Sequence, residues 1–200
     1  MNTEPASRSG LVREIFASVQ GEGKYLGRTQ FFVRLSGCNL ACPYCDTRHS
    51  PARKMSADAV IEAVEGLRRE HGAPHSVSIT GGEPMFQPRL CAEIMRQLRA
   101  RGYATYLETN ATLPDAEVIG LCDIISADIK APEDAATTDD IWDRHKTFLR
   151  AAAGKDLFVK MPVSTVAGMP GVTIEGDMAA LQSLLDALDP LPHGFDIVVP

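Results

Sequence analysis

The sequence predicts an α/β protein in which parallel strands form one sheet with helices packed outside it. Strand-like and helix-like stretches alternate after residue 28, and polar residues follow several of the strands. The expected strands cover 31–35, 77–80, 104–108, 124–130, 157–161 and 195–200. In such folds the carboxyl ends of the strands open on one rim, where ligands bind. We therefore expect sites that are distant in the sequence to converge there.

Helices are expected between these strands, over 56–70, 87–101, 141–152 and 177–188, with a short one opened by Pro114. In the first of them, apolar residues recur with the helical period from Ala59 to Leu67. Ser56 is expected to cap its start. The acidic stretch 132–140 is expected to be a solvated loop.

The composition is that of a globular protein of ordinary size. At 200 residues the chain fits one domain, which we place at 11–200 behind a flexible N-terminal segment at 1–10. The net charge of -6 gives no electrostatic reason to bind nucleic acid. No apolar run is long enough to span a bilayer, and the N-terminus lacks the apolar core of a signal peptide. We expect a cytoplasmic protein with neither a nucleic-acid nor a membrane partner.

Cys38, Cys42 and Cys45 follow the first predicted strand within eight residues. Close thiolates repel one another unless a cation neutralises them, so this crowding indicates a metal. The spacing C-x3-C-x2-C supplies three thiolates, whereas an ordinary iron–sulfur cluster is held by four. A four-iron cluster here would keep one iron open to another ligand. His49 completes a Cys3His set suited to zinc, so at this point both metals remain possible.

The other two cysteines are predicted to fill core space. Cys91 lies among apolar residues of a helix-like stretch, and Cys122 follows Leu121. Five cysteines in a chain without a secretion signal argue for reduced thiols and against a disulfide framework.

Two further features have alternative interpretations. The segment from Gln20 to Gly23 places two glycines around Glu22, which suits either a tight turn or close approach to a ligand. Arg34 lies within an apolar strand, where a charge is costly unless it is paired. It either holds a carboxylate or extends along the strand end to solvent.

The cysteine motif, together with Gly81-Gly82-Glu83-Pro84 at a strand end, resembles the radical S-adenosylmethionine superfamily. The resemblance implies a partial (β/α)6 TIM-like barrel with a [4Fe-4S] cluster on Cys38, Cys42 and Cys45. In this superfamily S-adenosylmethionine chelates the open iron and is cleaved to a 5′-deoxyadenosyl radical. The positions that would contact this cofactor are Tyr44, Cys45, Asp46, Gly81, Gly82 and Glu83.

A narrower resemblance is to the 7-carboxy-7-deazaguanine synthase family. The matching segments are Gln20–Gly23, Phe32–Leu40, Cys45–Thr47, Thr80–Pro84 and Leu107–Asn110. The family contracts the ring of 6-carboxy-5,6,7,8-tetrahydropterin with loss of ammonia, in 7-deazapurine and queuosine biosynthesis. By resemblance, the substrate contacts are Val19, Gln20, Gly21, Glu22, Arg34 and Thr80, and the hydroxyl of Thr47 binds Mg2+. Flavodoxin or ferredoxin is the implied electron donor, and a homodimer the implied assembly.

The chain departs from the family pattern at two places. The usual Ser-Pro-Lys is replaced by the segment from Ser126 to Lys130, so either Ser126 or Asp128 could take the cofactor ribose, with Lys130 nearby. The chain stops at Pro200, whose free carboxylate we expect to accept hydrogen bonds from the pterin. The alternative activity is that of a glycyl-radical-enzyme activase, which shares the cysteine spacing but acts on a protein.

Overall fold

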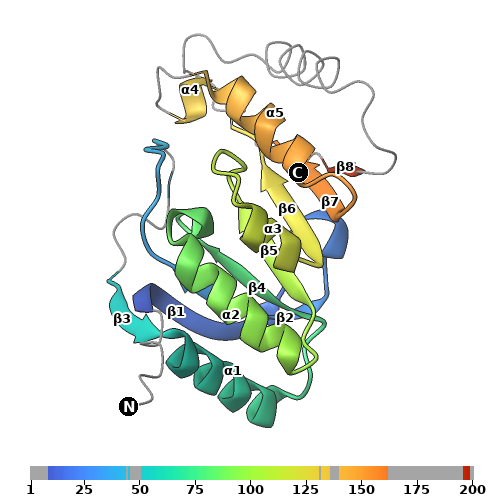
Figure 1. Ribbon diagram of the computed structural model, residues 1–200. Helices are drawn as coiled ribbons and strands as arrows, with labels where there is room; N and C mark the ends of the chain where they lie inside the picture. The colour runs from blue at the N-terminus through green and yellow to red at the C-terminus, as the bar shows by residue number, and fades with distance from the viewer. Residues whose placement is uncertain are drawn as a thin grey trace.

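The structure is a computed structural model that describes residues 9–43, 45, 51–130, 132–135, 140–161 and 196–198. Its strands form a single sheet in the order β3-β1-β2-β4-β5-β6-β7-β8. They span Ser9–Val19 (β1), Thr29–Leu35 (β2), Arg53–Ser56 (β3), Ser76–Gly81 (β4), Thr105–Thr109 (β5), Ile124–Asp128 (β6), Asp156–Lys160 (β7) and Asp196–Val198 (β8). The pairs from β2 through β8 are parallel, and the sheet order does not close on itself. The predicted partial barrel of six parallel strands is therefore confirmed (Figure 1).

Two antiparallel strands at one edge of the sheet were not predicted. β1 pairs with β2 on one side and with the short β3 on the other. β1 begins at Ser9, so Ser9 and Gly10 belong to the sheet and not to the flexible segment that the sequence suggested. Most of β1 is only partly buried, and Val12 alone is fully buried along it. β1 lies next to the edge strand β3 and lacks the apolar run that identifies a central strand.

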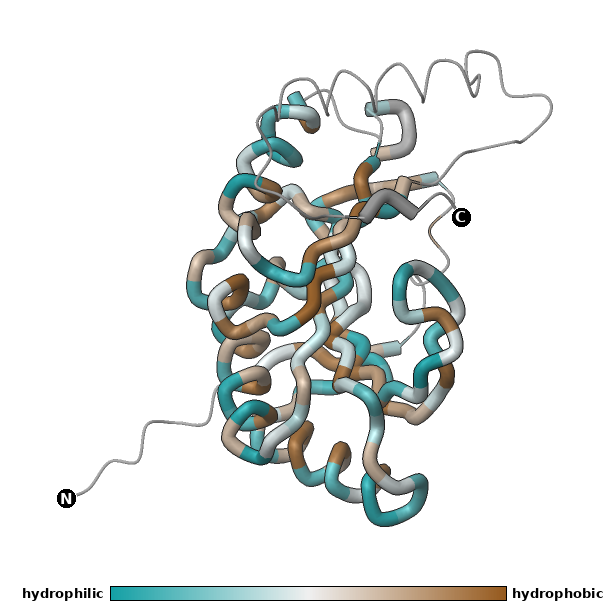
Figure 2. Tube along the Cα trace, turned by 90° about the vertical axis from the view of Figure 1, so that its right-hand side faces the viewer, coloured by the Kyte–Doolittle hydropathy of each residue, from teal (hydrophilic) through white to brown (hydrophobic). Residues whose placement is uncertain are grey.

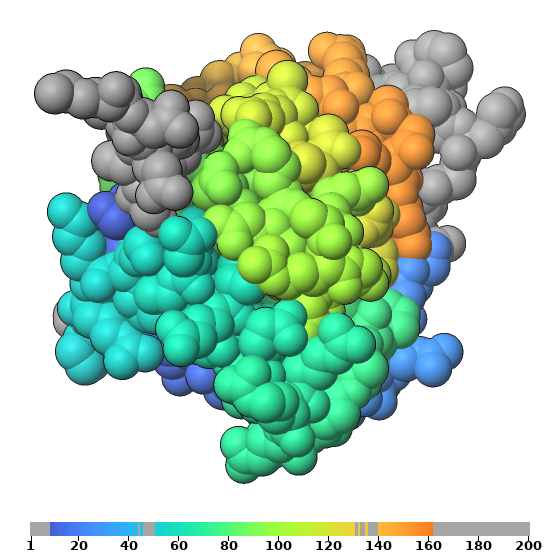
Figure 3. Space-filling view, turned by 60° about the horizontal axis from the view of Figure 1, so that its bottom comes forward, coloured from blue at the N-terminus to red at the C-terminus, as the bar shows by residue number. Residues whose placement is uncertain are grey.

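The helices cover one face of the sheet. Their bounds are Ala57–His71 (α1), Pro88–Ala100 (α2), Ala116–Leu121 (α3), Pro132–Ala135 (α4) and Ile141–Ala151 (α5), with 3-10 turns at Gly23–Tyr25 (η1) and Pro84–Phe86 (η2). Figure 1 shows α1, α2 and α3 side by side in front of the strands, and Figure 3 shows them as successive bands from teal to yellow-green. Along the coiled parts of the chain, hydrophobic and hydrophilic residues alternate (Figure 2). The expected helix at 177–188 lies outside the described residues.

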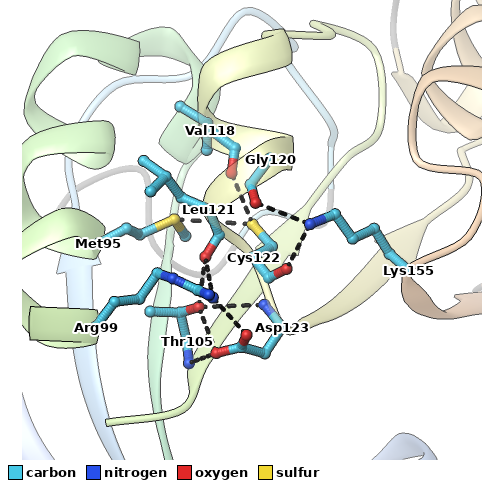
Figure 4. A network of polar contacts seen from close by, with 9 residues as sticks. All are labelled: Met95, Arg99, Thr105, Val118, Gly120, Leu121, Cys122, Asp123 and Lys155. Carbon is cyan, nitrogen blue, oxygen red and sulfur yellow. Dashed lines mark hydrogen bonds and ion pairs between the residues drawn. The ribbon is translucent and has the colours of Figure 1, made fainter. Parts of the chain in front are cut away.

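Local sequence explains where these helices begin and end. The Ser56 hydroxyl accepts a hydrogen bond from the Ala59 amide at 3.2 Å, which confirms the predicted cap of α1. The C-terminal end of α3 is held by Lys155, whose ammonium donates to the carbonyls of Gly120 and Cys122 at 2.8 and 3.0 Å (Figure 4). The acidic stretch predicted as a loop contains α4, so that prediction was wrong for 132–135. No helix in the described part of the chain is long and apolar enough to cross a membrane.

Alternation along the strands separates an apolar outer face from a polar inner one. On β2, Phe31, Val33 and Leu35 are buried in the main core beneath the helices. The alternate residues Phe32 and Arg34 point to the interior of the barrel, where they line a cavity. The inner face is therefore where ligand-contacting side chains gather.

Aromatic side chains fill the part of the barrel interior that lies away from the carboxyl ends of the strands. Tyr25 of η1 packs against Tyr106 of β5 and Phe158 of β7, with ring centroids 6.0 and 6.3 Å apart. Gly23, at φ +72°, permits this approach, because a Cβ there would lie 2.5 Å from the Phe158 ring. This packing leaves the open part of the interior at the carboxyl ends of the strands.

Candidate active site

A cavity of about 580 Å3 opens at the carboxyl ends of the parallel strands. Segments far apart in the sequence converge on it, as the fold class predicted. Of the residues singled out from the sequence, its lining contains Val19, Gln20, Gly21, Glu22, Arg34, Cys38, Cys42, Cys45, Thr80, Gly81, Gly82, Asp128 and Lys130. The predicted positions Tyr44, Asp46, Thr47 and Pro200, and the possible zinc ligand His49, lie outside the described residues.

The three motif cysteines are half-buried thiols on one side of the cavity. The Cys45 amide donates to the Cys42 carbonyl at 3.2 Å, and the Leu40 amide donates to the Cys38 sulfur at 3.4 Å. Burial raises the pKa of the Cys38 thiol, and the nearby carboxylate of Glu83 and the other two thiols raise it further. Three thiolates at this place would therefore need a bound cation to neutralise them.

A zinc ion and a cluster place different demands on their ligands. A zinc ion needs all its sulfur ligands about 2.3 Å from one point. A cubane cluster instead takes one thiolate on each iron, so its ligands lie farther apart. Within the described ranges, no three His, Cys, Asp or Glu side chains are grouped as ligands of one metal ion.

Gly81 and Gly82 form a side-chain-free cradle beside these thiols. Gly81 has φ +136°, and a Cβ on it would overlap the Leu35 carbonyl. A Cβ on Gly82 would overlap the Gly37 carbonyl and lie 3.1 Å from the Cβ of Cys38. The end of β4 therefore touches the backbone that leads into the cysteine motif, which only glycine permits.

Glu83 follows this cradle but does not reach the cavity. It is completely buried, and its carboxylate accepts hydrogen bonds from the Met85 amide at 2.8 Å and the Thr109 hydroxyl at 2.9 Å. Its second oxygen accepts from the Asn110 amide at 2.7 Å. Burial raises the pKa of Glu83 to about 7, although these hydrogen bonds oppose the shift. The contacts described make Glu83 a tie between the ends of β4 and β5.

The Gln20–Glu22 segment enters the cavity from the β1–β2 connection, and Gln20 holds it there. The Gln20 amide nitrogen donates to Gln30 at 3.0 Å and to Glu108 at 2.8 Å, while its oxygen accepts from the Glu22 amide. The other Glu108 oxygen accepts from the Thr80 hydroxyl at 2.8 Å. Because both amide hydrogens and the oxygen of Gln20 are bonded within the protein, this side chain fixes the segment in place.

Arg34 is paired within the protein. Its Nε donates to Glu14 at 2.6 Å, and its guanidinium lies 5.7 Å from the centroid of the Phe16 ring. Phe16 in turn stacks on Phe32 at 5.1 Å. These aromatic rings line the cavity next to Arg34 and add an apolar wall to an otherwise polar site.

The ends of β6 and β7 supply the charged side of the cavity. Asp128 lies between two lysines, with Lys160 Nζ at 3.3 Å and Lys130 Nζ at 3.6 Å from its carboxylate oxygens. Lys160 also pairs with Glu22 at 3.0 Å. Ser126, the alternative ribose contact, is completely buried and does not line the cavity.

A buried histidine of α5 holds the loops that follow β5 and β6. His145 Nδ1 lies 3.1 Å from the Ala111 carbonyl oxygen, and Nε2 lies 3.1 Å from the Lys130 carbonyl oxygen and 3.2 Å from the Lys130 amide nitrogen. Burial lowers the pKa of His145, although the hydrogen bonds to the Lys130 and Ala111 backbones oppose the shift. Ala111 has φ +53°, a conformation that costs energy outside glycine and is maintained by these bonds.

The sequence placed Glu108, Thr109 and Asn110 at a polar strand end on the ligand rim without giving them a role, and all three line the cavity. The lining residues that sequence reasoning missed are Phe16, Ser18, Phe32, Leu40 and Lys160. Lys160 stands near the carboxyl end of a predicted strand, so the rule that located Asp128 would have found it too. The inward-facing aromatic residues could have been found from the alternation along β1 and β2.

Comparison with known proteins defines the class to which this site belongs. The model of the radical SAM superfamily matches residues 32–184. QueE from Escherichia coli has the same fold, with a TM-score of 0.65 over 96% of this chain and 84% of that one, at 20% identity. The chain therefore belongs to the radical SAM superfamily.

The curated relatives narrow this class. The 7-carboxy-7-deazaguanine synthase of Methanopyrus kandleri is 41% identical over 160 residues, which cover 69% of this chain and 64% of that protein. That of Geobacter sulfurreducens is 38% identical over 76% of this chain and 69% of its own length. That of Methanocaldococcus jannaschii is 31% identical over 92% and 84%. Within the superfamily, the chain groups with the 7-carboxy-7-deazaguanine synthases, although it spans less than two thirds of the Methanopyrus protein.

The superfamily implies a [4Fe-4S] cluster and S-adenosylmethionine, and the residues of the cavity fit both. Three thiols suit three irons, and the Gly81–Gly82 cradle leaves room for a ligand next to them. Asp128 and Lys130 line the same cavity, where the Asp128 carboxylate can accept hydrogen bonds from hydroxyl groups and Lys130 supplies a cation. When bound, these groups supply a carbon radical that removes a hydrogen atom from the substrate. The protein binds, orients and shields the reacting molecules.

Proposed function

We propose that this chain is a 7-carboxy-7-deazaguanine synthase, a radical SAM lyase that contracts the ring of 6-carboxy-5,6,7,8-tetrahydropterin with loss of ammonia. One observation carries the proposal. The segment from Val19 to Glu22, which we call the pterin segment, lines the same cavity as the three thiols and the Gly81–Gly82 cradle. The names of its relatives support it.

Each part of the cavity then has a role. Cys38, Cys42 and Cys45 hold the cluster, and Gly81 and Gly82 contact the methionine part of the cofactor. Asp128, with Lys130 beside it, takes the cofactor ribose in preference to Ser126, because Asp128 alone of the two lines the cavity. Glu83 supports the cofactor site indirectly, through the ends of β4 and β5.

The pterin binds against Val19, Gly21 and Glu22, whose backbone is placed by Gln20. Arg34 and Thr80 also line the cavity, Arg34 next to the Phe16 ring and Thr80 bonded to the same carboxylate, Glu108, as Gln20. A pterin edge presents both donors and acceptors, which a backbone segment and a carboxylate match well.

Other parts of the proposal rest on the resemblance or on the sequence alone. Mg2+ on Thr47, flavodoxin or ferredoxin as the electron donor and a homodimer rest on the resemblance. A pterin contact from Pro200, a single domain and a cytoplasmic location rest on the sequence. An activase of glycyl-radical enzymes is not favoured, because the relatives carry the synthase name.

The test is anaerobic reconstitution with iron and sulfide, followed by incubation with carboxytetrahydropterin, S-adenosylmethionine and a reductant. We expect 7-carboxy-7-deazaguanine and an equal amount of ammonia, both detected by mass spectrometry or enzymatic assay. Cys42→Ala is the control and should yield neither. A reconstituted protein that cleaves S-adenosylmethionine but leaves the pterin intact would contradict the proposed substrate.

A further inference from the structure

Lys160 stands at the end of β7 with its charge almost completely withdrawn from solvent. Its side chain is 5% exposed, and the parallel register places it directly beside Asp128 of β6. A buried ammonium costs several kcal/mol unless it is paired. Burial alone would lower the pKa of Lys160, but Asp128, Glu108 and Glu22 together raise it above its ordinary value. The lysine is therefore charged and firmly held.

The two partners of Lys160 come from separate parts of the cavity. Glu22, at 3.0 Å, belongs to the connection between β1 and β2, whereas Asp128, at 3.3 Å, ends β6. The side chains of Glu22 and Asp128 are 53% and 35% exposed, and Asp128 also pairs with Lys130 at 3.6 Å. The buried ammonium of Lys160 thus links two partly exposed carboxylates that come from different elements of the fold.

We propose that Lys160 is a positioning residue that couples the two ligand subsites of this cavity. Lys160 holds Glu22 of the pterin segment and Asp128 at the end of β6 together. When one of them takes the position that binds its ligand, the other is therefore placed to bind the second ligand. The identity of the two ligands rests on the proposed function, whereas the mechanical link rests on the two ion pairs.

The link is first tested without pterin, by hydrogen exchange of the reconstituted protein. The turn that carries Glu22 is closed by two backbone bonds, from the Gln20 amide to the Arg28 carbonyl and from the Gly27 amide to the Gln20 carbonyl, both 2.8 Å. In Lys160→Met these two amides should exchange about tenfold faster, because the turn opens more often. Lys155→Met, which removes a lysine with two partners at the other end of the sheet, should leave them unchanged (Figure 4).

The coupling is then measured as the affinity for S-adenosylmethionine in a double-mutant cycle. We expect Lys160→Met to weaken binding about tenfold, and Glu22→Ala to weaken it severalfold although Glu22 is on the pterin side. In the Lys160→Met background, Glu22→Ala should have no further effect, and Lys160→Arg should restore most of the affinity.

Equal exchange rates in Lys160→Met and the wild type, or independent effects of the two substitutions, would overturn the proposal. A protein that shows the coupling but does not convert the pterin would overturn the proposed substrate and leave the link standing. The two conclusions are therefore separable.

Discussion

Replacing Glu83 by glutamine removes an ionisable group from a completely buried position while keeping its shape. The wild-type carboxylate accepts three hydrogen bonds, from Met85, Thr109 and Asn110. The amide of a glutamine accepts hydrogen bonds only on its oxygen. In the variant, the NH2 group would replace one carboxylate oxygen and face one of these donors. We expect the Glu83→Gln variant to be less stable than the wild type at neutral pH by about 2 kcal/mol, the cost of one buried donor left unsatisfied.

The pH dependence of this difference tests the position of the pKa. The pKa of Glu83 is about 7 in the folded protein and about 4.5 in a model peptide. A group that holds its proton more tightly when folded stabilises the fold below its unfolded pKa, and this stability is lost as the pH rises toward 7. Between pH 5 and pH 8 the wild type should lose about 2 to 3 kcal/mol that the glutamine variant does not lose.

Urea unfolding of the cluster-free, reduced proteins at the two pH values measures this difference. The free-energy gap between wild type and Glu83→Gln should narrow as the pH rises, since only the wild type titrates at this position. Glu62→Gln on the exposed face of α1 is the matched control, and its gap to the wild type should stay constant. A gap that widens with pH would show that the three hydrogen bonds outweigh burial, and would refute the reasoning.

Four further outcomes follow from packing and burial. Gly82→Ala should lower the free energy of unfolding by about 2 kcal/mol in urea titrations and reduce the iron bound on reconstitution, because the added methyl overlaps backbone. Gly66→Ala, in α1, should instead raise the free energy of unfolding by up to about 1 kcal/mol, because the added Cβ would lie 3.8 Å from the Arg69 guanidinium, an ordinary contact distance. Iodoacetamide should modify the three motif cysteines of the cluster-free native protein and spare Cys91 and Cys122, since burial raises the pKa of both (to about 12 for Cys122); labelling of either at the same rate, seen by peptide mass spectrometry, would contradict this. Lys155→Met should cost about 1 kcal/mol of stability through the lost cap of α3 and leave the affinity for S-adenosylmethionine unchanged, by thermal unfolding and titration respectively.

The parallel part of the sheet was predictable because its strands are short apolar runs separated by helical periods. In β2, the apolar run is clear because the residues on its outer face are buried in the core beneath the helices. β1 was not recognised because, as an edge-side strand, it buries little apart from Val12. Its existence depends on pairing with distant partners, which local sequence does not reveal.

Within the site, the sequence located the residues at strand ends but not the direction of every side chain. Glu83 follows two glycines that approach a ligand site, yet its carboxylate turns inward, where it caps η2 by accepting from Met85. The sequence also could not choose between Ser126 and Asp128 as the ribose contact. Residues two apart on a strand share a face of the sheet, but they lie at different depths in the barrel. The pairing of Lys160 with Glu22 could not be predicted, because the two are distant in the sequence and only the fold brings them together.

The imidazole of α5 has a consequence for the order in which the protein matures. His145 is needed to hold the Ala111 and Lys130 backbones, although the cysteines and the glycine cradle lie in the first half of the chain. A nascent polypeptide that has reached only β6 possesses every thiol yet lacks the group that sets the loops opposite them. We therefore expect iron and sulfide to be loaded after synthesis has passed α5, when the loops that follow β5 and β6 can take their final conformation.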